Sequence, residues 1–153
     1  MVAGALLALL SLTNVLLVAG GSVSLRGHPS PIYRDASEVA AMDWLAHHAG
    51  WEDVVLSTFG TGNYLPARAG VRVFVGHGPE TVGAETKKEL VARFFDGQTE
   101  DTWRQDLLAR YGVDYVFWGP AERALGVFSP PDATYLEVVY RAEGYAILEV
   151  RGD

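Results

Sequence analysis

The distribution of apolar and polar residues divides the chain into two unequal parts. Residues 2–21 (VAGALLALLSLTNVLLVAGG) carry no charged side chain, and the first charge in the sequence is Arg26. About 20 predominantly apolar residues suffice for a helix that crosses a bilayer. The stretch lacks the positively charged start and the small-residue cleavage site of a signal peptide, and it has no polar face. We therefore predict a transmembrane helix over residues 1–21; a signal peptide and a buried core helix are the alternatives.

The remainder of the chain has the alternating helix and strand patterns of a soluble α/β domain. Residues 22–34, with two prolines, are predicted to be a linker, and residues 35–153 a domain. Asp35, with Glu38 three positions later, predicts the start of the first helix, and Gly112 predicts the end of the third. The predicted helices are residues 35–49, 85–95 and 100–111, and the predicted strands are residues 53–58, 71–75, 113–118, 135–141 and 145–151.

The order of these elements predicts the fold class. Strands separated by helices favour a parallel sheet with helices on its faces. The last two strands are close enough along the chain to form a hairpin. We predict an α/β fold with a small, mostly parallel sheet flanked by helices and a C-terminal antiparallel hairpin, preceded by one transmembrane helix. The segment 59–70 (FGTGNYLPARAG) contains three glycines and Pro66, and is predicted to be a loop in which no helix begins.

Composition limits the partners of the predicted domain. All 12 basic and all 19 acidic residues follow the apolar segment, so the domain carries the whole net charge of −7. An acidic surface argues against a nucleic-acid partner, because phosphate binding needs clustered cations, and against docking on anionic lipid. The chain has no cysteine, which excludes disulfides and thiolate metal sites. No cofactor is predicted.

Two glycine-containing loops follow the first two predicted strands and are the best candidates for chemistry. Open α/β folds bind ligands where the carboxyl ends of parallel strands meet. Residues 60–63 (GTGN) lack the third glycine of a dinucleotide fingerprint, and no P-loop sequence is present. His77 and Glu80 alone are too few ligands for a metal site. The alternatives are that the glycines only satisfy positive-φ turns, or that His77 and Glu80 serve a hydrolase.

Hydroxyl, amide, imidazole and carboxylate groups without a lysine in either loop suit a polyhydroxylated ligand better than a phosphate. Glu122 and Arg123, which follow the third predicted strand, could join the same edge of the sheet. A salt bridge between them is equally compatible with the sequence. No catalytic residue and no metal ligand are predicted. The predicted ligand-binding residues are Thr61, Gly62, Asn63, His77, Glu80, Thr81, Glu122 and Arg123.

Four segments of the sequence resemble a known family. They are residues 35–81, 87–95, 107–126 and 135–150. Their most specific motifs are GTGN (residues 60–63), GH with ET (76–77 and 80–81) and GP with ER (119–120 and 122–123). They resemble the C-terminal region of large prokaryotic multi-pass membrane proteins related to C-type, polyprenyl-phosphate-sugar-dependent glycosyltransferases. In that family the catalytic carboxylate lies near the first membrane spans, so the resemblance implies that this chain is not catalytic by itself.

The resemblance and the patterns together give two functional hypotheses. The first is a non-catalytic extracytoplasmic domain of a cell-membrane protein of glycan or cell-envelope assembly. Its expected partners are the lipid bilayer, the other transmembrane helices of a longer parent protein, and a glycan or polyprenyl-linked sugar. The second is a free-standing, membrane-anchored or secreted module that binds a small molecule such as a sugar.

Overall fold

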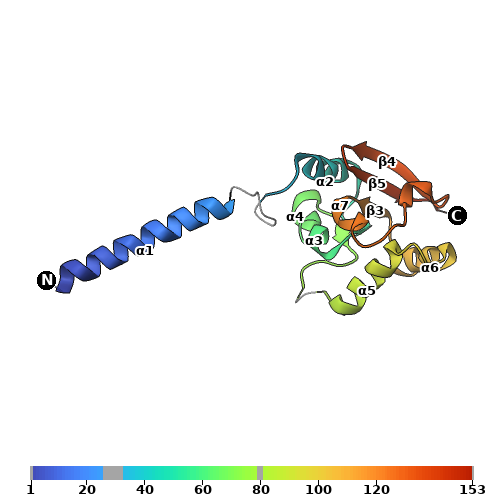
Figure 1. The fold of residues 1–153 in the computed structure, drawn as a ribbon. Coiled ribbons are helices and arrows are strands. Elements are labelled where there is room, and N and C mark those ends of the chain that lie inside the picture. Colours follow the sequence, from blue (N-terminus) through green and yellow to red (C-terminus); the bar gives the residue numbers. More distant parts are fainter. Residues whose placement is uncertain (1, 26–32, 79–80, 153) are drawn as a thin grey trace. The chain divides into compact units, whose positions relative to one another are not determined.

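The computed structural model describes residues 2–25, 33–78 and 81–152, which fall into two compact units, Met1–Asp35 and Ala36–Asp153. The first unit contains the helix α1 (Val2–Leu25), drawn in blue in Figure 1. This helix continues past the predicted end at residue 21 and takes in the first residues of the predicted linker. The side chains described on it, residues 10–24, are all exposed, and large apolar ones such as Leu16 and Val18 are 64% and 69% exposed.

The predicted membrane span is not borne out. Among the described residues, no helix is long and apolar enough to cross a membrane.

The second unit is built on one five-stranded sheet with the order β2-β1-β3-β5-β4. The pairs β1–β2 and β1–β3 are parallel, whereas β3–β5 and β4–β5 are antiparallel. The sheet is therefore mixed, and the prediction of a mostly parallel sheet is wrong. The reason is that the predicted hairpin does form, but its second strand pairs with the central strand β3 and so contributes half of the neighbour pairs. The strands are β1 (Val54–Leu56), β2 (Arg72–Val73), β3 (Tyr115–Trp118), β4 (Leu136–Ala142) and β5 (Tyr145–Val150).

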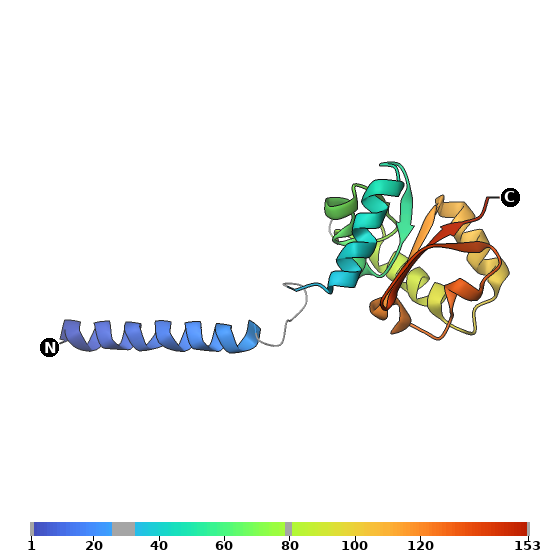
Figure 2. The same cartoon turned by 90° about the horizontal axis from the view of Figure 1, so that it is seen from above.

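Helices cover both faces of the sheet, as Figure 2 shows. Successive residues of a strand point to opposite faces, and the core follows this alternation. Val55 and Phe117 pack with α2 and α4 (Leu65–Ala69) on one face, whereas Leu56 and Val116 pack with α5 and α6 on the other. The domain thus encloses two apolar clusters of its own, one on each side of the sheet. The long helices are α2 (Ala36–His48), α5 (Ala84–Phe95) and α6 (Asp101–Tyr111).

The predicted loop between β1 and β2 instead contains two short helices, α3 (Phe59–Gly62) and α4 (Leu65–Ala69). The Thr58 side chain accepts a hydrogen bond from the Thr61 amide and so caps α3. Pro66 lies in the first turn of α4, where the missing N–H of proline removes no helical hydrogen bond. The prediction that Pro66 prevents a helix here is therefore wrong. Two further short elements follow β3, namely α7 (Pro120–Arg123) and η1 (Pro130–Asp132).

Candidate functional site

The three parallel strands β1, β2 and β3 bring the loops that follow them to one edge of the sheet. We call this edge the rim and define it as residues 57–64, 74–78, 81–83 and 119–127. The predicted ligand-binding residues that the structure describes all lie on it, since β1 ends at Leu56, β2 at Val73 and β3 at Trp118. Glu80, which was predicted to join them, lies outside the described residues.

Glu122 is the centre of the rim's hydrogen bonding, although its side chain is only 1% exposed. Its Oε1 accepts from the Thr58 amide at 3.0 Å and lies 2.9 Å from both the Thr58 and Thr61 hydroxyls. Its Oε2 accepts from the Gly119 amide at 3.0 Å. A buried carboxylate is tolerable only with such partners. Glu122 therefore connects the loop after β1 to the loop after β3 through hydrogen bonds. Both of its carboxylate oxygens and the Thr61 hydroxyl already have hydrogen-bond partners.

Gly62 and Gly76 let the loops after β1 and β2 touch backbone to backbone. A Cβ atom at position 62 would lie 2.0 Å from the Val75 carbonyl oxygen, and one at position 76 would lie 2.5 Å from the Gly62 carbonyl oxygen. Neither glycine has a positive φ. The close approach, rather than a positive-φ turn, explains why both positions need glycine.

Asn63 and His77 lie side by side on the rim. The Asn63 Oδ1 accepts from the His77 amide at 2.6 Å. His77 is in the left-handed region with φ of 43°, which costs a residue with a side chain about 1–2 kcal/mol. The His77 carbonyl accepts from the Thr81 amide at 3.0 Å, and the Thr81 hydroxyl donates to the Gly76 carbonyl. The strained backbone is thus fixed from both sides, and the imidazole is exposed to solvent.

Arg123 lies at the end of the rim nearest the β4–β5 hairpin. Its Nη2 donates to the Gly144 carbonyl at 2.6 Å, and its guanidinium lies 4.9 Å from the centre of the Trp118 ring. Arg123 does not pair with Glu122, whose carboxylate faces the other way, toward Thr58 and Gly119. The Trp118 indole Nε1 is buried without a hydrogen-bond partner.

The rim exposes hydrogen-bonding groups that can bind a ligand. Within the part of the chain that the structure describes, no group of three or more His, Asp or Glu side chains could hold a metal ion. The exposed imidazole of His77, the half-buried amide of Asn63 and the half-buried guanidinium of Arg123 are hydrogen-bonding groups that can contact a ligand from outside.

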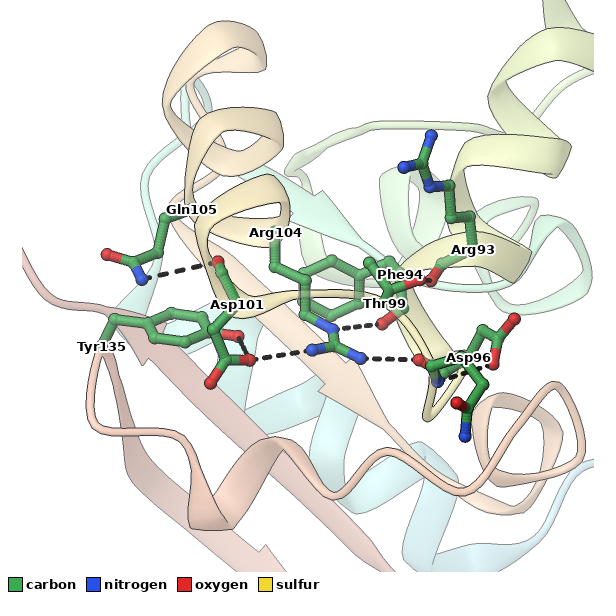
Figure 3. Close-up of polar contacts among 9 residues, drawn as sticks. Arg93, Phe94, Asp96, Thr99, Asp101, Arg104, Gln105 and Tyr135 are labelled. Carbon is green, nitrogen blue, oxygen red and sulfur yellow. Dashed lines mark hydrogen bonds and ion pairs between the residues drawn. The ribbon is translucent and has the colours of Figure 1, made fainter.

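The sequence patterns missed a second polar cluster, around Arg104 in α6 (Figure 3). Arg104 is 3% exposed, and its guanidinium donates to the carbonyls of Phe94 at 2.8 Å and Asp96 at 2.6 Å. It also pairs with Asp101 at 2.8 Å. Burial, and then the hydrogen bond from the Tyr135 hydroxyl to Asp101, raise the pKa of Tyr135. The cluster joins the end of α5 to α6 and to the segment before β4.

A signal for this cluster was present in the sequence. Arg104 follows Asp101 by three positions, which is the spacing of an ion pair on a helix. It also precedes Leu107 and Leu108 by three and four positions, which places it on the apolar face of the same helix. A charged residue on that face, with an acid one turn earlier, indicates a buried and paired arginine.

Comparisons with known proteins show a similarity of fold. No protein-family model matches the sequence, and no curated protein matches it. Among solved structures, the fold is similar to the C-terminal globular domain of an oligosaccharyltransferase from Archaeoglobus fulgidus. The TM-score is 0.56 at 14% sequence identity, and the match covers 77% of this chain and 99% of that domain. At this identity the similarity establishes a shared fold.

Proposed function

We propose that this chain is a non-catalytic, extracytoplasmic domain of a membrane protein that takes part in glycan or cell-envelope assembly. The observation that carries the proposal is the fold of residues 36–153, which is similar to that of a globular domain from an oligosaccharyltransferase. The family resemblance of the sequence points to the same class of membrane glycosyltransferases. The rim supplies hydrogen-bonding groups but no metal cluster among the described residues, which is consistent with a role in binding.

The exposed apolar helix α1 supports a membrane setting. Large apolar side chains from Leu10 to Val23 are 59–69% exposed. Leaving such surface in water is unfavourable by about 25 cal/mol per Å², and a contiguous exposed apolar surface marks an interaction site. We propose that lipid, together with apolar helices of a longer parent protein, covers α1.

The hydrogen bonding of the rim favours an uncharged, hydroxyl-rich ligand. The donors that point into the centre of the rim, namely the Thr58 and Gly119 amides and the Thr61 hydroxyl, already serve Glu122. An anion from outside would find these donors occupied and a buried carboxylate beside them. Sugar hydroxyls, which both donate and accept, can instead bond the outer groups Asn63 and His77. The sugar part of a polyprenyl-linked glycan fits these requirements.

The test is binding of a short-chain polyprenyl-phosphate hexose to the full chain in a neutral detergent, measured by calorimetry. We expect Asn63→Ala and His77→Ala to weaken binding at least fivefold. His47→Ala changes another exposed histidine, on α2, and is the matched control with unchanged affinity. Equal affinity of all four proteins, or no binding to the unsubstituted chain, would contradict the proposed role of the rim.

The side of the membrane is tested separately, using the absence of cysteine from the chain. We expect an Ala109→Cys variant, whose position is exposed on α6, to react in intact cells with a maleimide that cannot cross membranes. Reaction only after the cells are opened would place the domain in the cytoplasm.

A second candidate function is favoured by one observation. Residues 36–153 enclose both of their apolar clusters without help from another chain. A free-standing, membrane-anchored or secreted sugar-binding module would have this property. Such a module binds the sugar when it is expressed alone and does not co-purify from its native membrane with other membrane proteins, whereas a domain of a larger assembly does.

A further inference from the structure

We infer that Lys88 of α5 binds the phosphate group of a phosphate-linked sugar whose hydroxyls contact Asn63 and His77. The fold brings this lysine to the rim, although neither glycine loop contains a lysine of its own. The inference rests on the proposed function and deepens it, because it assigns the anionic part of the ligand to a residue outside the predicted ligand-binding set.

The ring of Phe59 is the point where α5 meets the rim. The Lys88 Nζ lies 4.2 Å from the centre of this ring, within the about 6 Å at which a cation is attracted to an aromatic face. Phe59 begins α3 and is half-buried. A Cβ atom at Gly78 would lie 3.4 Å from the Cζ atom of the same ring. The ammonium group of Lys88 therefore lies beside the loops that follow β1 and β2.

The Phe59 ring shares its surface with the outer polar groups of the rim. The Asn63 amide donates to the Phe59 carbonyl at 3.1 Å, and residues at this spacing lie on the same face of a helix. The second loop follows that face, since the His77 amide donates to the Asn63 Oδ1 at 2.6 Å and Gly78 lies next to the Phe59 ring. The polar groups of Asn63 and His77 and the ammonium group of Lys88 therefore belong to one continuous surface.

The present partner of Lys88 leaves it available to a ligand. Its Nζ lies 2.8 Å from the Glu85 Oε1, and the two side chains are 37% and 85% exposed. Ion pairs between such exposed groups contribute little to stability, and an ammonium group has three N–H donors. A phosphate can therefore bind Lys88 in addition to Glu85 or in its place. The negative charge of Glu85 opposes that binding, so its removal should strengthen it.

The rest of the rim is less suited to the phosphate. The donors at its centre already serve a buried carboxylate. Arg123 lies at the hairpin end of the rim, where it donates to the Gly144 carbonyl at 2.6 Å. Asn63 and His77 belong to the loops after β1 and β2, toward the other end of the strand order. Lys88, which touches those loops through an aromatic ring, is therefore placed to pair with the phosphate of a sugar bound there.

The test is calorimetry on the full chain in neutral detergent with two ligands that differ only in the phosphate. They are a short-chain polyprenyl-phosphate hexose and the matching polyprenyl hexoside. Lys88→Gln removes the cation, and Glu85→Gln removes the competing carboxylate. Lys87→Gln is the matched control, because Lys87 is the neighbouring lysine of α5 and its Nζ lies 5.3 Å and 6.0 Å from the ring centres of Phe74 and Tyr111 instead.

We expect Lys88→Gln to weaken binding of the phosphate ligand at least fivefold, Glu85→Gln to strengthen it at least twofold, and Lys87→Gln to leave it unchanged. Binding of the uncharged hexoside should be the same in all variants, which also shows that they are folded.

Equal affinity of the Lys88→Gln variant and the unsubstituted chain for the phosphate ligand overturns this inference, and the proposed function stands if Asn63→Ala still weakens binding. An equal loss for both ligands also overturns it, because Lys88 would then not contact the phosphate. Inorganic phosphate that binds as tightly as the sugar ligand would overturn it by showing a non-specific anion site. Absence of binding of both ligands to the unsubstituted chain contradicts the inference and the proposed function together.

Discussion

Replacing Glu122 by alanine tests the claim that this buried carboxylate holds the rim together. The change leaves the Thr58 and Gly119 amides without acceptors, whereas the Thr58 and Thr61 hydroxyls, 3.0 Å apart, can still bond each other. An unsatisfied buried amide costs about 1–3 kcal/mol, so two of them predict a loss of about 2–6 kcal/mol. That loss is a large part of the about 5–15 kcal/mol that stabilises a typical domain.

Glu122→Gln should be milder, because the amide oxygen can replace Oε1. Its NH₂ group would then face the Gly119 amide, which also donates, so one hydrogen bond is lost at a cost of about 1–3 kcal/mol. Glu143→Gln, at an exposed position in the β4–β5 turn, is the control and should change stability by less than about 0.5 kcal/mol.

The assay is urea unfolding of the full chain in neutral detergent, followed by tryptophan fluorescence. Trp118 lies beside the rim and reports on its integrity. The reasoning is refuted if Glu122→Ala lowers the free energy of unfolding by less than about 1 kcal/mol, or if the glutamine variant is less stable than the alanine variant.

Three further predictions concern close packing, the second polar cluster and pH. Gly62→Ala should destabilise the domain by about 1–3 kcal/mol or more, because the added Cβ would overlap the Val75 carbonyl. A Cβ added at Gly60 has no atom within 4 Å, so Gly60→Ala is the control and should leave stability nearly unchanged in the same unfolding assay. Arg104→Met should lower stability by about 1–3 kcal/mol, because it removes the buried donor to the carbonyls of Phe94 and Asp96. The other partner, Asp101, is 59% exposed and keeps its contact with water. A loss no larger than that of Arg110→Met, at an exposed position, would show that the cluster is not structural. The pKa of Tyr135 is raised in the folded state, so the unfolded chain loses the phenol proton at a lower pH than the folded chain does. The free energy of unfolding should therefore fall as pH rises above about 10, and Tyr135→Phe should reduce that fall. The same pH dependence of stability from pH 8 to 11 in the Tyr135→Phe variant would contradict the raised pKa of Tyr135.

Much of the fold could be predicted from periodicity because the long elements bury regular faces. Helices α2, α5 and α6 and the C-terminal hairpin follow the apolar spacing of the sequence, and Gly112 ends α6 in the left-handed conformation as predicted. The short helices α3 and α4 could not be predicted in this way. They depend on contacts between residues that are far apart in the sequence. One example is the hydrogen bond from the Thr58 amide to Glu122, two residues that are 64 positions apart.

The sheet and the rim show the same limit. The hairpin was predicted, but which strand it joins is decided by packing across the whole domain, so its antiparallel pairing with β3 was missed. Glu122 was predicted to face a ligand because it lies in the loop after the third predicted strand, at the same edge as the glycine loops. Its burial follows from four donors that gather only after β1 and β3 pair. Asn63 and His77 were predicted to share one edge, and the structure places them 2.6 Å apart, from Asn63 Oδ1 to the His77 amide. Their ligand role stays a prediction.

The most direct test of the proposed function is a map of amide chemical shifts on the isotope-labelled full chain, recorded while a short-chain polyprenyl-phosphate hexose is added. Our account predicts saturable shifts at residues 58–63, 76–78 and 119–123. It also predicts no shifts at the opposite end of the sheet, around Trp51 and Gly112. Shifts confined to that opposite end, or no saturable shifts at all, would contradict it.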